Sequence, residues 1–243
     1  MERKLNPNIS VDVVIFAVDE KVLRVLLVDR QMGSEMQGVS HPMDSKLPGG
    51  LVFNDELLIE ASQRILSDLT GVEGIDLEQF DVLDSLERMN NEWDKKWLEK
   101  TSGVKIDRVV SIAFFGIAHY DRVKKINLKN NAHWTIWNDK LKLPFDHNEI
   151  ISAALEKVKT GLKKDALLFQ LLPEKFTISQ LKNILEVFYE KDLDSRNFRK
   201  KIKKLNYIVA LEEKQSNVPH KPAGFFRFDK KRFMQFNNDR ITF

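Results

Sequence analysis

The sequence predicts an α/β (α+β) domain followed by a smaller winged helix-turn-helix domain, and three observations predict this fold. The chain has 243 residues, more than one typical domain of ~100–150 residues needs. β-branched runs and amphipathic stripes come first, whereas short helices and then two short strands follow. The charge also changes, since residues 161–243 hold 18 Lys and Arg against 10 Asp and Glu, and residues 1–160 hold 21 against 26. We therefore expect two domains, residues 1–161 and 162–243.

The composition excludes several classes of protein. The chain has no cysteine, which excludes disulfide frameworks, thiolate metal sites and cysteine nucleophiles. No run approaches the ~18 apolar residues of a membrane span, and the start Met1–Lys4 has no apolar signal segment. Apolar residues make up 42%, charged residues 31%, and the mean hydropathy is −0.35. We expect a cytoplasmic protein with no membrane partner.

The first domain begins with a predicted β-hairpin. Val11–Val18 and Leu23–Asp29 are β-branched runs on either side of a polar turn. A strand with Gly49 and Gly50 follows, and the next helix is predicted to have Asn54 and Asp55 at its N-cap and Gly71 after its end. Further elements are expected as strands at Gln79–Leu83 and Arg108–Tyr120 and as a helix at Asp146–Lys159.

The second domain has the element order of a winged helix-turn-helix. Thr177 and Gln180 form a predicted capping box, and Asp194 is the next N-cap. The expected elements are helices at Asp165–Leu172, after Thr177 and at Ser195–Leu205, and a strand pair at Tyr207–Leu211 and Gly224–Phe228. Helix, helix, turn, helix and a two-stranded ribbon is the order of this fold.

The third of these helices is the strongest chemical signal. Residues 195–204 contain six cations, and Phe198 and Ile202 hold the opposite face against the core. Arg can read guanine and Asn can read adenine, whereas Lys suits phosphates. The predicted DNA-binding residues are Ser195, Arg196, Asn197, Arg199, Lys200, Lys203 and Lys204, with His220 and Lys221 at the tip of the wing. A solvated lysine-rich helix and a protein-binding winged helix are the alternatives, and RNA is disfavoured because no aromatic cluster lies on a sheet.

Residues Gly50–Val72 resemble the Nudix box. The family pattern is Gly, five residues, Glu, seven residues, then Arg-Glu-aliphatic-any-Glu-Glu-any-Gly-aliphatic. The residues in register are Gly50, Glu56, Arg64, Leu66, Gly71 and Val72, while the metal-binding glutamates of the family fall on Ile65, Asp68 and Leu69. The resemblance implies an α/β/α sandwich with a mixed sheet and a degenerate Nudix box.

The replaced glutamates change the expected chemistry. Positions 65, 68 and 69 lie on one helix face, and hydrolysis of a pyrophosphate there requires several carboxylates around Mg²⁺. Asp68 alone is one hard ligand beside hydrocarbon. We therefore expect no catalytic residue, no bound metal and no cofactor. The alternative is a Nudix hydrolase that cleaves ADP-ribose or a nucleoside diphosphate derivative with Mg²⁺, using Asp68, Glu60 and Glu56.

The chain as a whole resembles the Nudix-related transcriptional regulators of the NrtR type. Their recognition-helix run Arg-Asn-Phe-Arg-Lys is similar to Arg196–Lys200, and Val109–Ala113 and Leu143–His147 resemble further Nudix segments. The resemblance implies a homodimeric repressor that binds double-stranded operator DNA. It also implies a small effector, which in this family is a sugar, a sugar phosphate or an ADP-ribose-like nucleotide.

The predicted effector-binding residues lie around the glycine turn. Arg30 ends a strand and Lys46 precedes Gly49 and Gly50, so all four are expected to face an anionic or hydroxyl-rich ligand. The alternative for Arg30 and Lys46 is that both lie at the edge of the pocket and extend their charged groups into water. Arg64 is expected to pair with Glu60 or Glu56. The insert Glu87–Lys105, with Trp93 and Trp97, and the stretch Met32–Ser45 are expected to form a pocket wall, a dimer contact or a loop.

Overall fold

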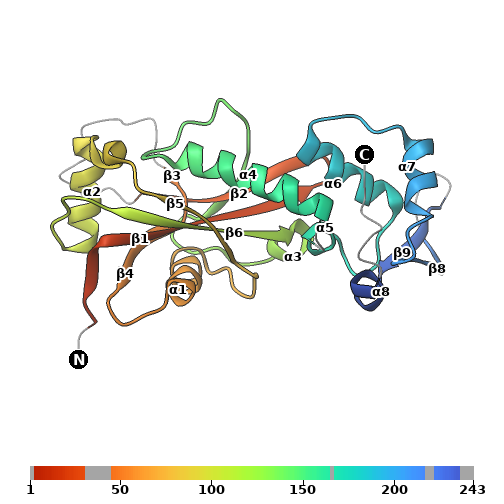
Figure 1. Ribbon diagram of the computed structural model, residues 1–243, viewed down its shortest axis with the longest axis horizontal. Helices are drawn as coiled ribbons and strands as arrows, with labels where there is room; N and C mark the ends of the chain where they lie inside the picture. Colours follow the sequence, from red (N-terminus) through yellow and green to blue (C-terminus); the bar gives the residue numbers. More distant parts are fainter. Residues whose placement is uncertain (1–2, 31–44, 165–166, 217–221, 236–243) are drawn as a thin grey trace. The chain divides into compact units, whose positions relative to one another are not determined.

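The structure is a computed structural model that describes residues 3–30, 45–164, 167–216 and 222–235 (Figure 1). Its contacts divide the chain into two compact units. The first unit consists of residues 1–16, 24–117 and 122–154, and the second of residues 17–23, 118–121 and 155–243. Among the described helices, none combines the length and apolarity that crossing a membrane requires.

One sheet forms the centre of the first unit. The strand order is β3-β2-β1-β6-β5, while β4 pairs with β1 and β7 pairs with β2. The strands are β1 (Leu5–Asp19), β2 (Val22–Asp29), β3 (Ser45–Lys46), β4 (Gly49–Phe53), β5 (Glu78–Leu83), β6 (Val110–His119) and β7 (His133–Ile136). The predicted β1–β2 hairpin and the two later strands are confirmed.

Helices cover both faces of this sheet. They are α1 (Leu58–Thr70), α2 (Glu92–Ser102), α3 (Tyr120–Val123) and α4 (His147–Lys164), together with the 3₁₀ turn η2 (Leu86–Met89). Figure 1 shows α1 and α4 on opposite sides of the strands. Successive side chains of a strand point to opposite faces, so Val11, Val13 and Ile15 of β1 pack in one cluster with Ala61 and Ile65 of α1. The predicted α/β sandwich is confirmed.

The beginning of α1 differs from the prediction. Leu57, and neither Asn54 nor Asp55, occupies the N-cap position. The polar side chains of Asn54 and Asp55 instead contact residues near the N-terminus of the chain. An oxygen of Glu60 accepts a hydrogen bond from the Leu57 N–H at 2.9 Å and thereby satisfies the first free amide of the helix.

The second unit has the predicted order of a winged helix-turn-helix. Its elements are α5 (Leu167–Gln170), α6 (Ile178–Tyr189), α7 (Ser195–Ile202), β8 (Ile208–Lys214), β9 (Gly224–Phe228) and α8 (Lys230–Gln235). The capping box of Thr177 and Gln180 is present. Helix α7 is shorter than predicted, because the N–H groups of Lys204 and Leu205 bond to carbonyls three residues back and tighten the last turn. Helix α8 was not predicted.

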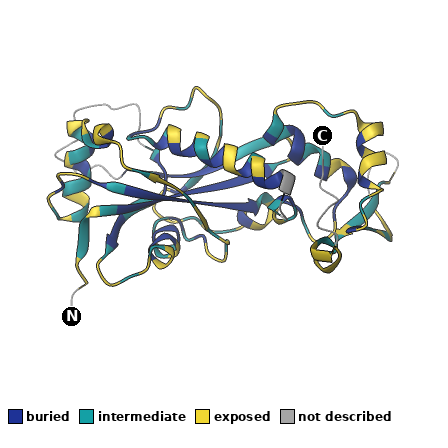
Figure 2. Ribbon diagram, viewed as in Figure 1, coloured by how far each residue is buried: buried dark blue, intermediate teal, exposed yellow. Residues whose placement is uncertain are grey.

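Buried side chains form a separate core in the second unit. The stripe Leu181, Ile184, Leu185 and Phe188 of α6 is buried as predicted (Figure 2). An aromatic cluster lies beneath the wing, where the ring of Phe169 stacks on Phe228 with 3.6 Å between centroids. The rings of Tyr207 and Phe233 pack edge-on against the same pair. This cluster holds α5, the wing and α8 together.

Helix α4 belongs to both units, since the division between them falls after Ala154. The helix continues through Gly161 to Lys164, beyond the predicted end at Lys159. In the second unit, the Tyr189 hydroxyl donates a hydrogen bond to the Lys159 carbonyl at 2.8 Å. A domain boundary at residue 161 stays a prediction.

Candidate functional site

Helix α7 presents its polar side chains to solvent. An oxygen of Asp194 accepts a hydrogen bond from the Asn197 N–H at 2.8 Å, as predicted for the N-cap. Phe198 and Ile202 are buried and fix which face of the helix points inward. The described residues predicted to bind DNA are all exposed: Ser195, Arg196, Asn197, Arg199, Lys200, Lys203 and Lys204. His220 and Lys221 lie outside the described residues.

Most of the positive charge at residues 195–204 is not paired with an acid in the described part of the chain. Within the described part of the chain, no carboxylate pairs with Arg196, Arg199, Lys200, Lys203 or Lys204. Other lysines of the same unit do have partners, since Lys182 pairs with Glu186 at 2.8 Å and Lys175 pairs with Glu213 at 2.7 Å. The exposed side chains of α7 therefore create a concentrated positive potential, which favours the binding of a polyanion.

The turn before α7 is held by a buried carboxylate. Glu186 of α6 accepts a hydrogen bond from the Leu193 N–H at 2.8 Å and pairs with Lys182. Burial alone would raise the pKa of Glu186, but the hydrogen bonds from Lys182 and the Leu193 N–H outweigh burial and keep the pKa below its ordinary value. The ionised side chain thus fixes the direction in which α7 leaves α6.

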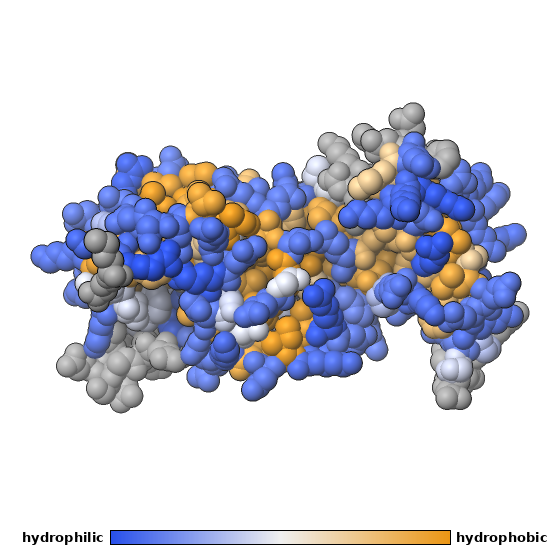
Figure 3. Space-filling view, turned by 90° about the horizontal axis from the view of Figure 1, so that it is seen from below, coloured by the Kyte–Doolittle hydropathy of each residue, from blue (hydrophilic) through white to orange (hydrophobic). Residues whose placement is uncertain are grey.

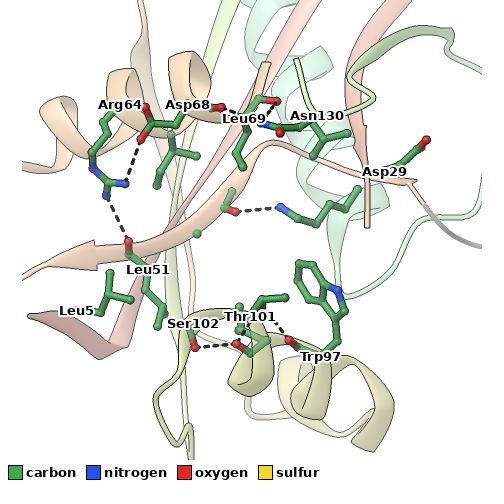
Figure 4. Close-up of a pocket in the computed structure, with 16 residues that line it drawn as sticks. Leu5, Asp29, Leu51, Arg64, Asp68, Leu69, Trp97, Thr101, Ser102 and Asn130 are labelled. Carbon is green, nitrogen blue, oxygen red and sulfur yellow. Dashed lines mark hydrogen bonds and ion pairs between the residues drawn. The ribbon is translucent and has the colours of Figure 1, made fainter. Parts of the chain in front are cut away.

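A cavity of about 380 Å³ lies in the first unit (Figure 4). Arg64, Asp68 and Leu69 of α1 lie on one side of it. Trp97, Thr101 and Ser102 of α2 lie on the other side, and β4 runs between the two helices. Leu98 of α2 also lines the cavity. The predicted insert therefore forms a pocket wall. A cavity of this size with mixed apolar and polar walls suits a small molecule.

The degenerate Nudix box lines this cavity. Ile65 and Leu69 supply hydrocarbon at two of the three metal positions of the family. The side chain of Asp68 is 65% exposed, and one of its oxygens lies 3.9 Å from Nη1 of Arg64. Gly50 of β4 lines the same cavity, as predicted.

Glu56 and Arg64 form an ion pair. The Glu56 side chain is 3% exposed, accepts two hydrogen bonds from Arg64 and accepts a third from the Phe53 N–H at 2.8 Å. Burial would raise the pKa of Glu56, but these hydrogen bonds lower it below the ordinary value. The pair ties α1 to the end of β4, so the structural role predicted for Arg64 agrees with the geometry.

The residues present do not fit Mg²⁺. Among the residues that the structure describes, no group of three or more His, Asp or Glu side chains is arranged to hold a metal ion. Glu56 is occupied by Arg64, Glu60 caps α1, and Asp68 has apolar neighbours at positions 65 and 69. Mg²⁺ prefers six oxygen ligands, and the described residues around the Nudix box do not provide such a set.

Lys46 is the cation at the floor of the cavity. Its Nζ donates hydrogen bonds to the carbonyls of Leu47 and Gly49, both at 2.9 Å, and lies 5.6 Å from the ring centre of Trp97. Burial lowers the pKa of Lys46 to about 8, although Asp12 opposes this shift. The Lys46 ammonium group has three N–H donors, so one donor remains for a ligand after these two hydrogen bonds.

Arg30 does not line this cavity, contrary to the prediction, whereas Gly49 lines it as predicted. The side chain of Arg30 is buried, pairs with Asp94 of α2 at 2.5 Å, and lies 4.1 Å from the ring centre of Trp93. Arg30 therefore anchors α2. Gly49 offers its carbonyl to Lys46, but a Cβ at Gly49 would lie 2.0 Å from an oxygen of Asp12. The missing side chain makes room for Asp12.

A buried charged network lies on the opposite face of β1 from α1. Asp12 accepts hydrogen bonds from Arg88 at 2.5 Å and from the Ser111 hydroxyl at 2.6 Å, and Nε2 of His147 lies 3.5 Å away. Burial would raise the pKa of Asp12, but Arg88 and His147 hold it far below the ordinary value. Nδ1 of His147 accepts a hydrogen bond from the Leu47 N–H at 3.1 Å, which places the ring proton on Nε2.

Comparisons with known proteins agree with both units. Residues 168–228 match the family model described as the NrtR DNA-binding winged helix domain. Over 244 residues the chain is 27% identical to the "ADPR responsive transcriptional repressor NtrR" of Acinetobacter baylyi, which covers 97% of this chain and 87% of that protein. The resemblance to the NrtR-type regulators is confirmed.

Solved structures show the fold of the whole chain. The crystal structure of Shewanella oneidensis NrtR complexed with a 27mer DNA matches with a TM-score of 0.68 and 21% identity, covering 92% of this chain and 94% of that one. A MutT/nudix family protein from Enterococcus faecalis matches with a TM-score of 0.64 and 19% identity, covering 94% and 88%. The fold is therefore a Nudix-type domain joined to an NrtR-type winged helix.

Several residues of the site had no role in the sequence prediction. Thr101 and Ser102 were predicted only as part of the insert Glu87–Lys105 and were not singled out, and Asp12, Arg88 and Ser111 were not predicted to meet. The one signal in the sequence is Asp12, an acid inside the apolar run of β1, because a buried charge requires a partner. That partner, Arg88, lies in an insert whose position no periodicity could predict.

Proposed function

We propose that this chain is a transcriptional repressor that binds double-stranded operator DNA through α7 and responds to ADP-ribose. The observation that carries the proposal is the row of exposed cations Arg196, Arg199, Lys200, Lys203 and Lys204, which have no carboxylate partner among the described residues, within an NrtR-type winged helix. The name of the Acinetobacter baylyi relative supports both the repressor role and the effector.

The side chains of α7 divide by chemistry. Arg196 and Asn197 lie in the first turn, where a recognition helix meets base edges, and both side chains can form two parallel hydrogen bonds with a purine. Lys200, Lys203 and Lys204 come later and suit phosphate oxygens. The chain is therefore expected to read sequence with the start of α7 and to gain affinity from its end.

The cavity supplies the groups that ADP-ribose requires. Lys46 and Arg64 are cations for the diphosphate, the Trp97 ring is a wall for the adenine, and the hydroxyls of Thr101 and Ser102 suit ribose. A sugar or sugar phosphate would use only part of this lining. ADP-ribose is therefore the effector that we propose.

We also propose that the Nudix-type domain has no hydrolase activity and uses neither Mg²⁺ nor another cofactor. The apolar Ile65 and Leu69 and the occupied Glu56 support this. A homodimer would match a palindromic operator, and a cytoplasmic location follows from a role on DNA. Light scattering of the purified chain measures the oligomeric state.

Variants of α7 test the DNA-binding role. Duplexes selected from a random library provide the preferred sequence, and fluorescence anisotropy then gives Kd on selected and random DNA. Arg196→Ala and Asn197→Ala should each cost ~1–3 kcal/mol on selected DNA and relax the preference at one base pair. Lys204→Ala should weaken both DNAs alike. Equal losses on both DNAs for all three variants would contradict the assignment.

Calorimetry tests the binding of the effector, and a separate incubation tests the absence of hydrolase activity. ADP-ribose should bind the wild-type protein more tightly than ribose 5-phosphate or AMP does. Incubation of ADP-ribose with Mg²⁺ should release no AMP. Release of AMP that Asp68→Asn abolishes would establish the hydrolase instead.

A further inference from the structure

We propose that helix α8 is a second contact of this chain with DNA and binds phosphates of the backbone outside the α7 contact. The proposal rests on the proposed DNA-binding function. The family model ends at Phe228, so α8 (Lys230–Gln235) lies beyond the domain that the model describes. The evidence is the charge of α8, its fixed position and its link to the segment after α7.

The charge around α8 is strongly positive. Residues 227–232 contain four cations and one acid, Asp229. The Asp229 carboxylate lies 3.7 Å from Arg227 and 3.7 Å from Arg232 and accepts a hydrogen bond from the Arg232 N–H. Lys230 and Lys231 are exposed, and within residues 3–30, 45–164, 167–216 and 222–235 neither has a carboxylate partner. These two ammonium groups are therefore available to an outside anion.

The position of α8 is fixed by aromatic packing. The Phe233 ring lies 5.1 Å from that of Tyr207 and 5.3 Å from that of Phe228. Tyr207 is fully buried and directly precedes strand β8 of the wing, so α8 is attached to the core of the second unit. Cations on a fixed helix lose less conformational freedom on binding than cations on a free tail do.

A hydrogen bond links α8 to the segment that follows α7. Nη1 of Arg232 donates to the Asn206 carbonyl at 3.3 Å, and Asn206 comes two residues after Lys204. This hydrogen bond joins the side chain of Arg232 in α8 to the backbone of the segment that follows the lysine-rich end of the recognition helix. Figure 3 draws one face of the protein, on which hydrophilic side chains surround the apolar patches.

Lysine chemistry determines what α8 can recognise. An ammonium group is a compact point charge that suits phosphate and does not present the two-pronged geometry that reads guanine. Each phosphate that is neutralised releases condensed counterions, so the logarithm of the association constant falls by about 0.9 per contact for each tenfold rise in salt. Contacts from α8 should therefore add affinity and salt dependence, and no sequence preference.

Salt titrations of the full-length protein test the proposal without knowledge of the operator. Kd for a random-sequence 30-base-pair duplex is measured by anisotropy over a range of KCl concentrations. Lys230→Ala/Lys231→Ala should reduce the salt slope by about 2 and weaken binding at 0.1 M salt by roughly 10- to 60-fold. The matched control Lys140→Ala/Lys142→Ala removes the same charge from exposed lysines of the first unit and should leave the slope unchanged.

The outcomes separate this inference from the proposed function. A slope that stays at the wild-type value in the α8 variant overturns the α8 contact, and so does an equal loss in the control. If Arg199→Ala/Lys200→Ala loses affinity while the α8 variant does not, the role of α7 stands and that of α8 fails. If the wild-type protein binds no duplex even at low salt, the proposed function itself fails. Circular dichroism confirms that each variant is folded.

Discussion

At the scale of single residues, Gly49 is required by a buried carboxylate. A Cβ at position 49 would lie 2.0 Å from Oδ1 of Asp12 and 3.0 Å from the Val11 carbonyl, both of which are fixed in the sheet. Gly49→Ala should therefore lower the free energy of unfolding by about 1–3 kcal/mol in urea titrations. Gly50→Ala is the matched control, because its Cβ would lie 3.8 Å from Ile65, an ordinary contact. Equal effects of the two substitutions would contradict the contact with Asp12.

His147 should give the fold a dependence on pH. Burial lowers the pKa of the imidazole, and Arg88 and Lys46 oppose a further positive charge, although Asp12 favours one. Between the lowered pKa and the ordinary value near 6.5 the unfolded chain binds a proton that the folded chain does not. The free energy of unfolding should therefore fall as the pH drops below about 6.5, by up to ~1.4 kcal/mol per pH unit.

His147→Asn should remove this dependence. Its side-chain oxygen can still accept the Leu47 N–H, but the residue does not titrate. Urea titrations at pH 7.5 and 5.5 should show a smaller difference for the variant than for the wild-type protein. His133→Asn changes a partly exposed histidine and serves as the control. The same pH difference in wild type and His147→Asn would exclude His147 as its source.

At the scale of elements, the N-cap determines whether α7 forms. The helix has eight residues, so few of its amides have an intrahelical partner and Asp194 satisfies one of them. Asp194→Ala should cost about 0.5–2 kcal/mol in stability and weaken DNA binding through loss of helix. Asp192→Ala removes the same charge from an exposed position nearby and should cost little. Thermal unfolding and anisotropy measure both effects, and equal losses would show that charge alone matters.

The sequence predicted the elements whose signals are local. The capping box at Thr177, the N-cap at Asp194 and the buried stripe of α6 all depend on neighbours a few residues away. The N-cap of α1 was wrong because long-range contacts with the N-terminal segment occupy Asn54 and Asp55. Helix α8 was missed because its six residues are too few for a clear periodicity.

The same distinction applies to the candidate site. The apolar Ile65 and Leu69 at metal positions of the Nudix box could be identified from the resemblance to that family, and the exposed cations of α7 could be predicted from helical spacing. The roles of Arg30 and Arg88 could not be predicted, because each depends on where the insert with α2 packs against the sheet. Contacts between residues far apart in sequence have no periodic signal.

At the scale of the whole molecule, five of the described elements contribute residues to both units. They are strands β1, β2 and β6 and helices α3 and α4, so the units share continuous secondary structure rather than a single linker. An effector and an operator that bind one such chain are thermodynamically linked if the effector favours one conformation. This linkage leads to a prediction that does not depend on the direction of the response.

ADP-ribose and DNA should affect each other's affinity by the same factor. If saturating ADP-ribose changes Kd for operator DNA by a given factor, saturating operator DNA must change Kd for ADP-ribose by that factor, and 1–3 kcal/mol of coupling corresponds to about 5- to 150-fold. Anisotropy measures the first change, and calorimetry of the free protein and the DNA complex measures the second. Ribose 5-phosphate at the same concentration is the control ligand. A factor of one in both measurements would mean that the cavity and α7 act independently, and the effector would then have to be sought among other molecules.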